Sequence, residues 1–219
     1  MKSFIVLLSL CTFIFTIAKS QNYFEGTIKY NITYEGRELS AAEKAQMPSE
    51  QVVYYKEGQA RTDMVTAMGT VITISNSDTK ETVLLLDMLG NKMAVKSSKE
   101  ENEKAISEMT EPEIVSLDET KEIAGYKCKK TEIKSDGNKI TAYTTDELNV
   151  KDANWQNYKD LTGVMLEYSV NNSQDEDLIM TFSAVEITKS KIKPKIFEVP
   201  SDYQMMTQEE FKSMLGGGQ

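Results

Sequence analysis

The run from residue 52 to residue 95 constrains the fold most, because it holds five short β-strand patterns separated by turn residues. The predicted strands cover 51–57, 60–66, 70–75, 82–87 and 91–95. Gly58, Gly69 and Gly90 lie in the connections, which are too short for a crossover, so the run predicts an antiparallel meander. The fourth strand, around Leu85, is apolar on both faces. We therefore expect both faces of the sheet to be covered there.

The remaining chain also predicts antiparallel β-structure. Residues 24–34 alternate, with Ile28, Tyr30 and Ile32 on one face and Lys29 and Asn31 on the other. Two hairpins are predicted, one from 126–134 with 139–145 and one from 164–171 with 178–189. Short strands are predicted at 114–117 and 196–199.

Three or four short helices are predicted between or after these strands. Ser40 with Glu43 and Thr207 with Glu210 have the spacing of capping boxes. The charged segment 98–109 favours a solvated surface helix, and the segment 152–161 around Trp155 has apolar residues at helical spacing. The sum is a mainly β (α+β) fold: a strongly curved antiparallel sheet, or incomplete β-barrel, of about ten strands with short helices covering its concave face.

Residues 1–20 have the pattern of a secretory signal peptide. Lys2 precedes an apolar core, and Ala18 and Ser20 form a small-residue cleavage site. The apolar run is shorter than the ~20 residues that span a bilayer, so we do not expect a membrane-spanning chain after cleavage. Residues 21–219 are predicted to form a single β half-barrel domain with a C-terminal helix. The expected location is exported, either periplasmic or secreted.

Composition excludes several classes of function. Removing Lys2 and Lys19 from the 25 basic residues leaves 23 against 34 acidic ones, a net charge of −11, which disfavours nucleic acid as a partner. The sequence contains no His, which excludes His-dependent triads and makes a zinc site improbable. We predict no catalytic residue, no metal site and no cofactor. Cys128 is the one cysteine left after cleavage, and we expect it to be buried.

Three segments carry a resemblance to a known family. These are 123–130 (IAGYKCKK), 24–30 (FEGTIKY) and 197–203 (FEVPSDY) before a Thr-capped helix. Together they resemble domain-of-unknown-function family 4412, exported proteins of Bacteroidota-type bacteria. That family in turn is similar to periplasmic lipoprotein carriers of the LolA/LolB kind. The resemblance implies an incomplete barrel closed by helices, with an apolar cavity for acyl chains and no catalytic residues.

The leading hypothesis is an exported, non-enzymatic protein that binds an apolar ligand, lipid or acyl chains, in the concave face of its sheet. Methionines adapt to irregular apolar shapes and would suit such a lining. The predicted ligand contacts are Ile28, Tyr30, Ile32, Met64, Met93, Trp155, Leu166, Tyr168 and Met180. The alternative is an envelope structural or protein-interaction module whose concavity is filled by its own side chains. An enzyme is the third reading.

Overall fold

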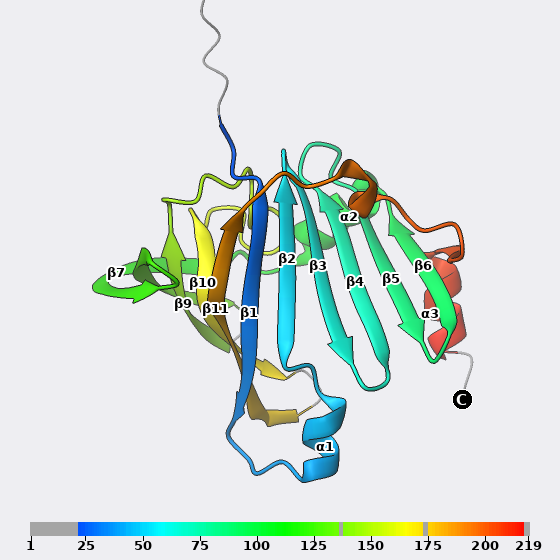
Figure 1. Ribbon diagram of the computed structural model, residues 1–219, viewed down its shortest axis with the longest axis horizontal. Helices are drawn as coiled ribbons and strands as arrows, with labels where there is room; N and C mark the ends of the chain where they lie inside the picture. Colours follow the sequence, from blue (N-terminus) through cyan, green and yellow to red (C-terminus); the bar gives the residue numbers. More distant parts are fainter. Residues whose placement is uncertain (1–21, 136–137, 173–174, 217–219) are drawn as a thin grey trace, which may run out of the picture.

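The computed structural model describes residues 22–135, 138–172 and 175–216, so the predicted signal segment 1–20 lies outside the described residues. One 12-stranded sheet dominates the fold, with three short α-helices and one 3₁₀ helix (Figure 1). The elements are β1 (Gly26–Glu35), α1 (Ala41–Gln46), β2 (Glu50–Lys56), β3 (Gln59–Thr66), β4 (Gly69–Asn76), β5 (Thr82–Met88), β6 (Asn91–Ser97), α2 (Lys99–Glu108), β7 (Glu113–Ile123), β8 (Tyr126–Ser135), β9 (Asn138–Thr145), β10 (Val164–Asn172), β11 (Asp175–Lys189), η1 (Pro194–Phe197), β12 (Gln204–Thr207) and α3 (Gln208–Gly216).

The sheet order is β12-β6-β5-β4-β3-β2-β1-β11-β10-β9-β8-β7. The predicted mainly β fold with a mostly antiparallel sheet is confirmed, and strands β2 to β6 form the predicted meander. The exception is β12, which pairs with β6 in parallel and was not predicted. The pairing of β1 with β11 joins the meander to the second half of the chain. Residues 136–137 and 173–174, where the sequence predicted the hairpin connections, lie outside the described residues.

The sheet is strongly curved. Thr73 and Ser75 on β4 line the same hollow as Met165 and Tyr168 on β10, although four strands separate β4 from β10 in the sheet. We call the face that lines this hollow the concave face and the opposite face the convex face. α2 lies behind the sheet in the view of Figure 1, on the concave side, where Asn102 Nδ2 donates to Thr82 Oγ1 at 3.3 Å.

The main core lies on the concave face of β1, β2, β10 and β11. Ile28 and Leu166 are fully buried there, Ile28 on the apolar face that the alternation of residues 24–34 predicted. The segment 146–163 covers this part of the sheet, with Leu148, Val150 and Ala153 packed against the core. Cys128 is also fully buried in this core, which confirms its predicted burial.

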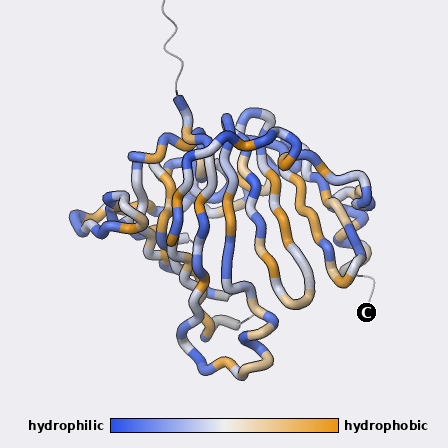
Figure 2. The backbone as a smooth tube through the Cα atoms, viewed as in Figure 1, coloured by the Kyte–Doolittle hydropathy of each residue, from blue (hydrophilic) through white to orange (hydrophobic). Residues whose placement is uncertain are grey.

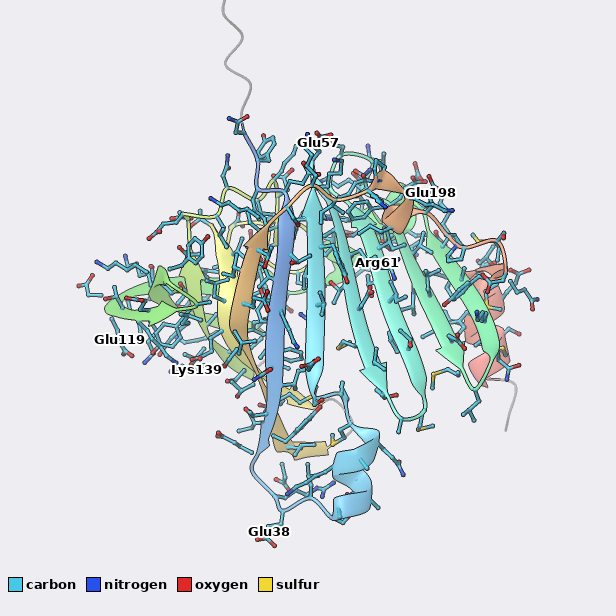
Figure 3. All side chains as sticks on the ribbon, viewed as in Figure 1. Glu38, Glu57, Arg61, Glu119, Lys139 and Glu198 are labelled. Atoms are coloured by element: carbon cyan, nitrogen blue, oxygen red, sulfur yellow. The ribbon has the colours of Figure 1, made fainter. Side chains whose placement is uncertain are left out.

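A second core lies on the convex face, under the segment 190–203. Phe197 packs there with Ile72 and Leu85, and Leu85 is fully buried, as the doubly apolar strand predicted. Arg61 Nη1 donates to the Ile196 carbonyl oxygen at 2.7 Å and fixes this segment across β3. The segment crosses the front of the meander in Figures 1 and 2, and Figure 3 places Arg61 beneath it on the convex face.

Two local predictions are wrong, and a third is confirmed with a longer element. Segment 196–199 is not a strand: Phe197 ends the short 3₁₀ helix that begins at Pro194, and Pro has no backbone N–H for a sheet ladder. Segment 152–161 is a series of turns and not a helix. Asp152 has a φ of 46°, which interrupts helical geometry at its start. The predicted strand 114–117 is confirmed, as part of the longer β7, which has a register shift between Ser116 and Thr120.

Both predicted capping boxes form. Ser40 and Glu43 exchange the two reciprocal hydrogen bonds at α1, and Thr207 and Glu210 do the same at α3. α1 projects from one end of the sheet, so it does not cover the concave face (Figure 1). Across the described part of the chain, no helix combines the length and apolar character needed to cross a membrane.

Candidate functional site

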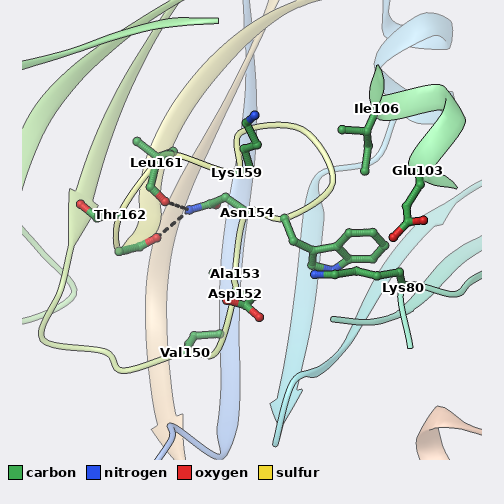
Figure 4. A pocket seen from close by; sticks show the side chains of 12 residues that line it. Lys80, Glu103, Ile106, Val150, Asp152, Ala153, Asn154, Lys159, Leu161 and Thr162 are labelled. Carbon is green, nitrogen blue, oxygen red and sulfur yellow. Dashed lines mark hydrogen bonds between the residues drawn. The ribbon is translucent and has the colours of Figure 1, made fainter. Parts of the chain in front are cut away.

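A groove runs between α2 and the turns of segment 150–163, on the side of that segment that faces away from the sheet (Figure 4). It consists of two adjoining cavities of about 510 and 500 Å³. Glu103 and Ile106 of α2, together with Trp155 and Lys159 of the turn segment, line both cavities. We call this the outer groove.

Trp155 forms a wall of the outer groove, and Lys80 lies against it. The Lys80 ammonium is 4.8 Å from the centroid of the indole ring, within the range of a cation–π contact. Lys80 has a φ of 59°, and its carbonyl oxygen accepts a hydrogen bond of 2.7 Å from Asn102 Nδ2. The contact between α2 and the β4–β5 connection therefore holds the Lys80 side chain over the indole.

Asn154 fixes the shape of the turn segment. Its side-chain amide donates to the carbonyl oxygens of Leu161 at 2.9 Å and Gly163 at 2.8 Å, drawn as dashed lines in Figure 4. Backbone hydrogen bonds from Trp155 to Asp152 and from Leu161 to Tyr158 close two further turns. These bonds position Trp155 without a helix.

The charged groups of the outer groove are weakly paired. Glu103 lies 3.7 Å from Lys99, and Lys159 lies 3.4 Å from Glu111, all with exposed side chains. Ion pairs of this kind contribute little and leave their groups available to a ligand. For Lys80, the structure gives no ion pair to any of the residues it describes.

A smaller hollow of about 140 Å³ lies on the other side of the turn segment, against the sheet. We call it the inner hollow. Its lining residues are Tyr30, Gln51, Val53, Tyr55, Ala60, Thr62, Thr73, Ser75, Ala153, Asn154, Gln156, Val164, Met165 and Tyr168. Gln51 Nε2 donates to the Tyr168 hydroxyl at 3.4 Å, and the Tyr30 hydroxyl donates to the Met165 carbonyl at 2.9 Å. Burial raises the pKa of Tyr168 to about 12, so its hydroxyl stays neutral.

The structure separates the residues predicted to contact a ligand. Trp155 lines the outer groove, and Tyr30 and Tyr168 line the inner hollow. Most of the others are in or against the main core: Ile28, Ile32, Met64, Leu166 and Met180. Met93 is half-buried on β6, outside this core. The role of these residues as ligand contacts stays a prediction.

Sequence reasoning missed most of the polar lining. The same face of the meander as Met64 carries Gln51, Thr62, Thr73 and Ser75. The strand alternation and the short turns could have predicted that these side chains share a face. Lys80 gave no such signal, because only the tertiary fold brings it to Trp155. Among the described residues, no group of three or more His, Cys, Asp or Glu side chains could hold a metal ion.

Comparison with known proteins corrects the expected resemblance. The family described as N-glycanase peptide, N-terminal domain, matches residues 80–212. These residues include two of the three segments that suggested domain-of-unknown-function family 4412 and the LolA/LolB carriers, so that assignment was wrong. The misleading motifs form a tight turn at Ala124-Gly125 and the end of η1, which many β-folds could contain.

Two solved structures of PNGF-II have a similar fold. The structure in space group C2 has a TM-score of 0.58 and 16% identity, over 88% of this chain and 32% of its own. The structure in space group P21 has a TM-score of 0.58 and 17% identity, over 87% of this chain and 33% of its own. The chain therefore spans about a third of the length of these proteins, and the likeness at this identity shows the fold alone.

No curated protein matches the chain. The family match covers more than half of the sequence and includes α2, the turn segment and Trp155, which together form the outer groove. The protein belongs to the N-glycanase peptide, N-terminal domain, family.

Proposed function

We propose that the protein is an exported, non-catalytic binding module that holds a carbohydrate chain in the outer groove. The observation that carries this proposal is the lining of the groove, which combines one indole with side chains that can donate and accept hydrogen bonds. Pockets with an aromatic wall and a few placed polar groups are typical ligand sites. A sugar ring offers an apolar C–H face to an indole and hydroxyl groups to the side chains around it.

The polar groups of the groove suit a ligand with many hydroxyls. Glu103 accepts hydrogen bonds, Lys159 donates them, and Asn157 does both. Because acidic and basic groups both occur, the groove has no strong preference for a ligand of one charge. The open, extended form of two adjoining cavities fits a chain better than a single small molecule.

The non-catalytic part of the proposal is supported by the titratable groups. The sequence has no His, and each carboxyl group with a resolved pKa shift in the described part of the chain is shifted downwards, as in Glu119 beside Lys130. General acids in hydrolytic sites need raised pKa values. The family name supports carbohydrate as the ligand class, because it names an N-glycanase, of which this domain is the N-terminal part.

An apolar ligand is the second candidate. Leu84, Leu86 and Met93 are half-buried on the concave face of β5 and β6, beyond the main core, and Met64 on β3 packs against the edge of that core. These side chains could take part of an acyl chain, at ~0.8 kcal/mol for each buried methylene. The packing of segment 146–163 against the main core supports the alternative predicted from the sequence, a self-filled core with no ligand.

Calorimetric titration of the full mature chain separates these candidates. We expect saturable binding of neutral oligosaccharides and no saturable binding of a fluorescent fatty-acid probe. Saturable binding of the fatty acid alone would favour the apolar ligand. If neither binds, the carbohydrate proposal fails and the self-filled structural module takes its place.

A matched pair of variants on α2 tests whether the ligand binds in the outer groove. Glu103 and Glu108 each form a weak i,i+4 pair, with Lys99 and Lys104, but Glu108 does not line the groove. Glu103→Ala should weaken oligosaccharide binding about tenfold, the loss of a hydrogen bond to a charged group. Glu108→Ala should leave binding unchanged. Equal effects of the two substitutions would place the ligand elsewhere.

A further inference from the structure

The inner hollow differs from the outer groove because no charged side chain lines it. Its sheet side is formed by hydroxyl-bearing residues of three adjacent strands. These are Tyr55 on β2, Thr62 on β3, and Thr73 and Ser75 on β4, and the strand registers place Tyr55, Thr62 and their neighbours on one face. The hollow is a polar and uncharged site inside the concavity.

The hydroxyl groups of these residues have no protein partner. The structure gives the side chains of Tyr55, Thr62, Thr73 and Ser75 no hydrogen bond to any residue it describes. These hydroxyl groups also remain accessible from the hollow. In the described part of the chain, Ser77 Oγ is the only side-chain polar atom that is fully enclosed and lacks a hydrogen-bond partner. Polar groups at buried sites are nearly always hydrogen-bonded, so these hydroxyls are free to donate to or accept from a molecule that enters the hollow.

Amide groups complete the site from the other side. Gln51 is 7% exposed, and its amide nitrogen reaches the Tyr168 hydroxyl at 3.4 Å. Gln156 of the turn segment also lines the hollow. The amides and hydroxyls both donate and accept, and the rings of Tyr55 and Tyr168 offer apolar faces between them. An ionised ligand would find no opposite charge here, and burying an unpaired charge is costly.

From these contacts we infer that the inner hollow is a second binding site, which takes one small, neutral, polyhydroxylated molecule such as a polyol or a single uncharged sugar unit. At about 140 Å³ the hollow is well below the size of sites for larger ligands, which limits the occupant to about one ring. Segment 153–156 lies between the hollow and the outer groove, and Ala153, Asn154 and Gln156 line both. Thr73 lines the hollow alone, and Glu103 lines the groove alone.

The test is to titrate the full mature chain with a panel of small molecules at millimolar concentration and to monitor binding by NMR chemical-shift changes. The neutral probes are D-glucose and myo-inositol, and the charged comparators are D-glucuronate and D-glucosamine. We expect saturable shifts at Gln51 and Thr73 with at least one neutral probe and none with the charged compounds. Equal binding of charged and neutral probes, or no saturable shift with any of them, would overturn the inference, and so would a crystal soaked with the neutral probes that holds water only.

A pair of threonine variants on one strand tests the contact itself. Thr73 faces the hollow, whereas Thr70 lies on the opposite face of β4, paired with Asp87. Thr73→Val should weaken binding of the neutral probe about fivefold, the loss of one neutral hydrogen bond. Thr70→Val should not change it, and equal affinities of the two variants would contradict the site. Glu103→Ala should leave the affinity of the probe unchanged, so failure in the outer groove and failure here are distinguishable.

Discussion

The Lys80 ammonium lies 4.8 Å from the centroid of the Trp155 ring, although Lys80 has the left-handed backbone conformation that favours glycine, with a φ of 59°. The strained backbone and the cation–π contact oppose each other in the free energy of unfolding. A left-handed residue with a Cβ costs roughly 1–2 kcal/mol, and a partly exposed cation–π contact contributes about 0.5–1 kcal/mol. The cation–π contact therefore offsets only part of the backbone cost.

Two substitutions at Lys80 separate these effects. Lys80→Ala loses the contact and keeps the strain, whereas Lys80→Gly loses the contact and relieves the strain. We expect the glycine variant to be more stable than the alanine variant by about 1 kcal/mol in urea denaturation. A glycine variant that is the less stable of the two would show that the backbone at Lys80 is not strained.

Cys128 should be unreactive in the folded protein. Its side chain is fully buried, and burial, followed by the negative charges of Glu147 and Glu167, raises the pKa of its thiol to about 11 from an ordinary value of 9.0. A maleimide reagent should label it slowly in the native protein and rapidly in denaturant. Because the unfolded chain ionises first, stability should fall as pH rises from about 9 to about 11. Equal labelling rates in the two states would refute this burial.

The capping box of α1 should be sensitive to acid. Glu43 accepts hydrogen bonds from Ser40 Oγ, Ser40 N and Arg37 Nη2, and these lower the pKa of its carboxyl to about 2 from 4.5. A lowered pKa in the folded state means that the stabilisation is present above pH 4.5 and is lost as pH falls towards 2. Amide NMR signals of α1 should therefore change over this range.

Two variants check the origin of that transition. Glu43→Gln should remove most of the pH dependence at α1, because the glutamine side chain does not ionise. Glu38→Gln, at an exposed glutamate outside the capping box, should leave the transition in place. A transition that persists in Glu43→Gln would assign it to another group.

Leu89 should be replaceable with a gain in stability. It is 86% exposed and has a φ of 52°, in a two-residue turn with Gly90 at a φ of 89°. Such turns favour asparagine at the first position. Leu89→Asn should raise the free energy of unfolding by about 0.5–1 kcal/mol. Met68→Asn, in the connection between β3 and β4 at a position without positive φ, should have no such effect. A destabilised Leu89→Asn would contradict the assignment of the turn.

Much of the fold could be predicted because the information is local. The meander from β2 to β6 follows from two-residue alternation and from glycine at turns. The strand around Leu85, apolar on both faces, indicated cover on both sides of the sheet. The helix predicted around Trp155 failed because Tyr158 and Leu161 at helical spacing also suit successive tight turns. Asp152 and Asn154, both common in turns, were the signal against a helix.

The candidate site was less predictable because curvature creates it. Alternation places Thr62 and Thr73 on one face, but it does not say that β10 bends round to bring Tyr168 opposite them. Lys80 and Trp155 are likewise far apart in the sequence, and only the tertiary fold brings them into contact. Apolar periodicity identified the packed core, and the hydrogen-bonding side chains of the groove and hollow carry no periodic signal of their own.

The most direct test of the proposed function uses Trp155, the single tryptophan of the chain, as the reporter. Because its indole lines the outer groove, a carbohydrate chain that binds there should change the fluorescence of the mature protein. Titration with neutral oligosaccharides should give a saturable change in emission, weakened about tenfold in Glu103→Ala and unaltered in Glu108→Ala. Emission that stays constant while the oligosaccharide binds, or an effect of equal size in both variants, would contradict the assignment of the groove.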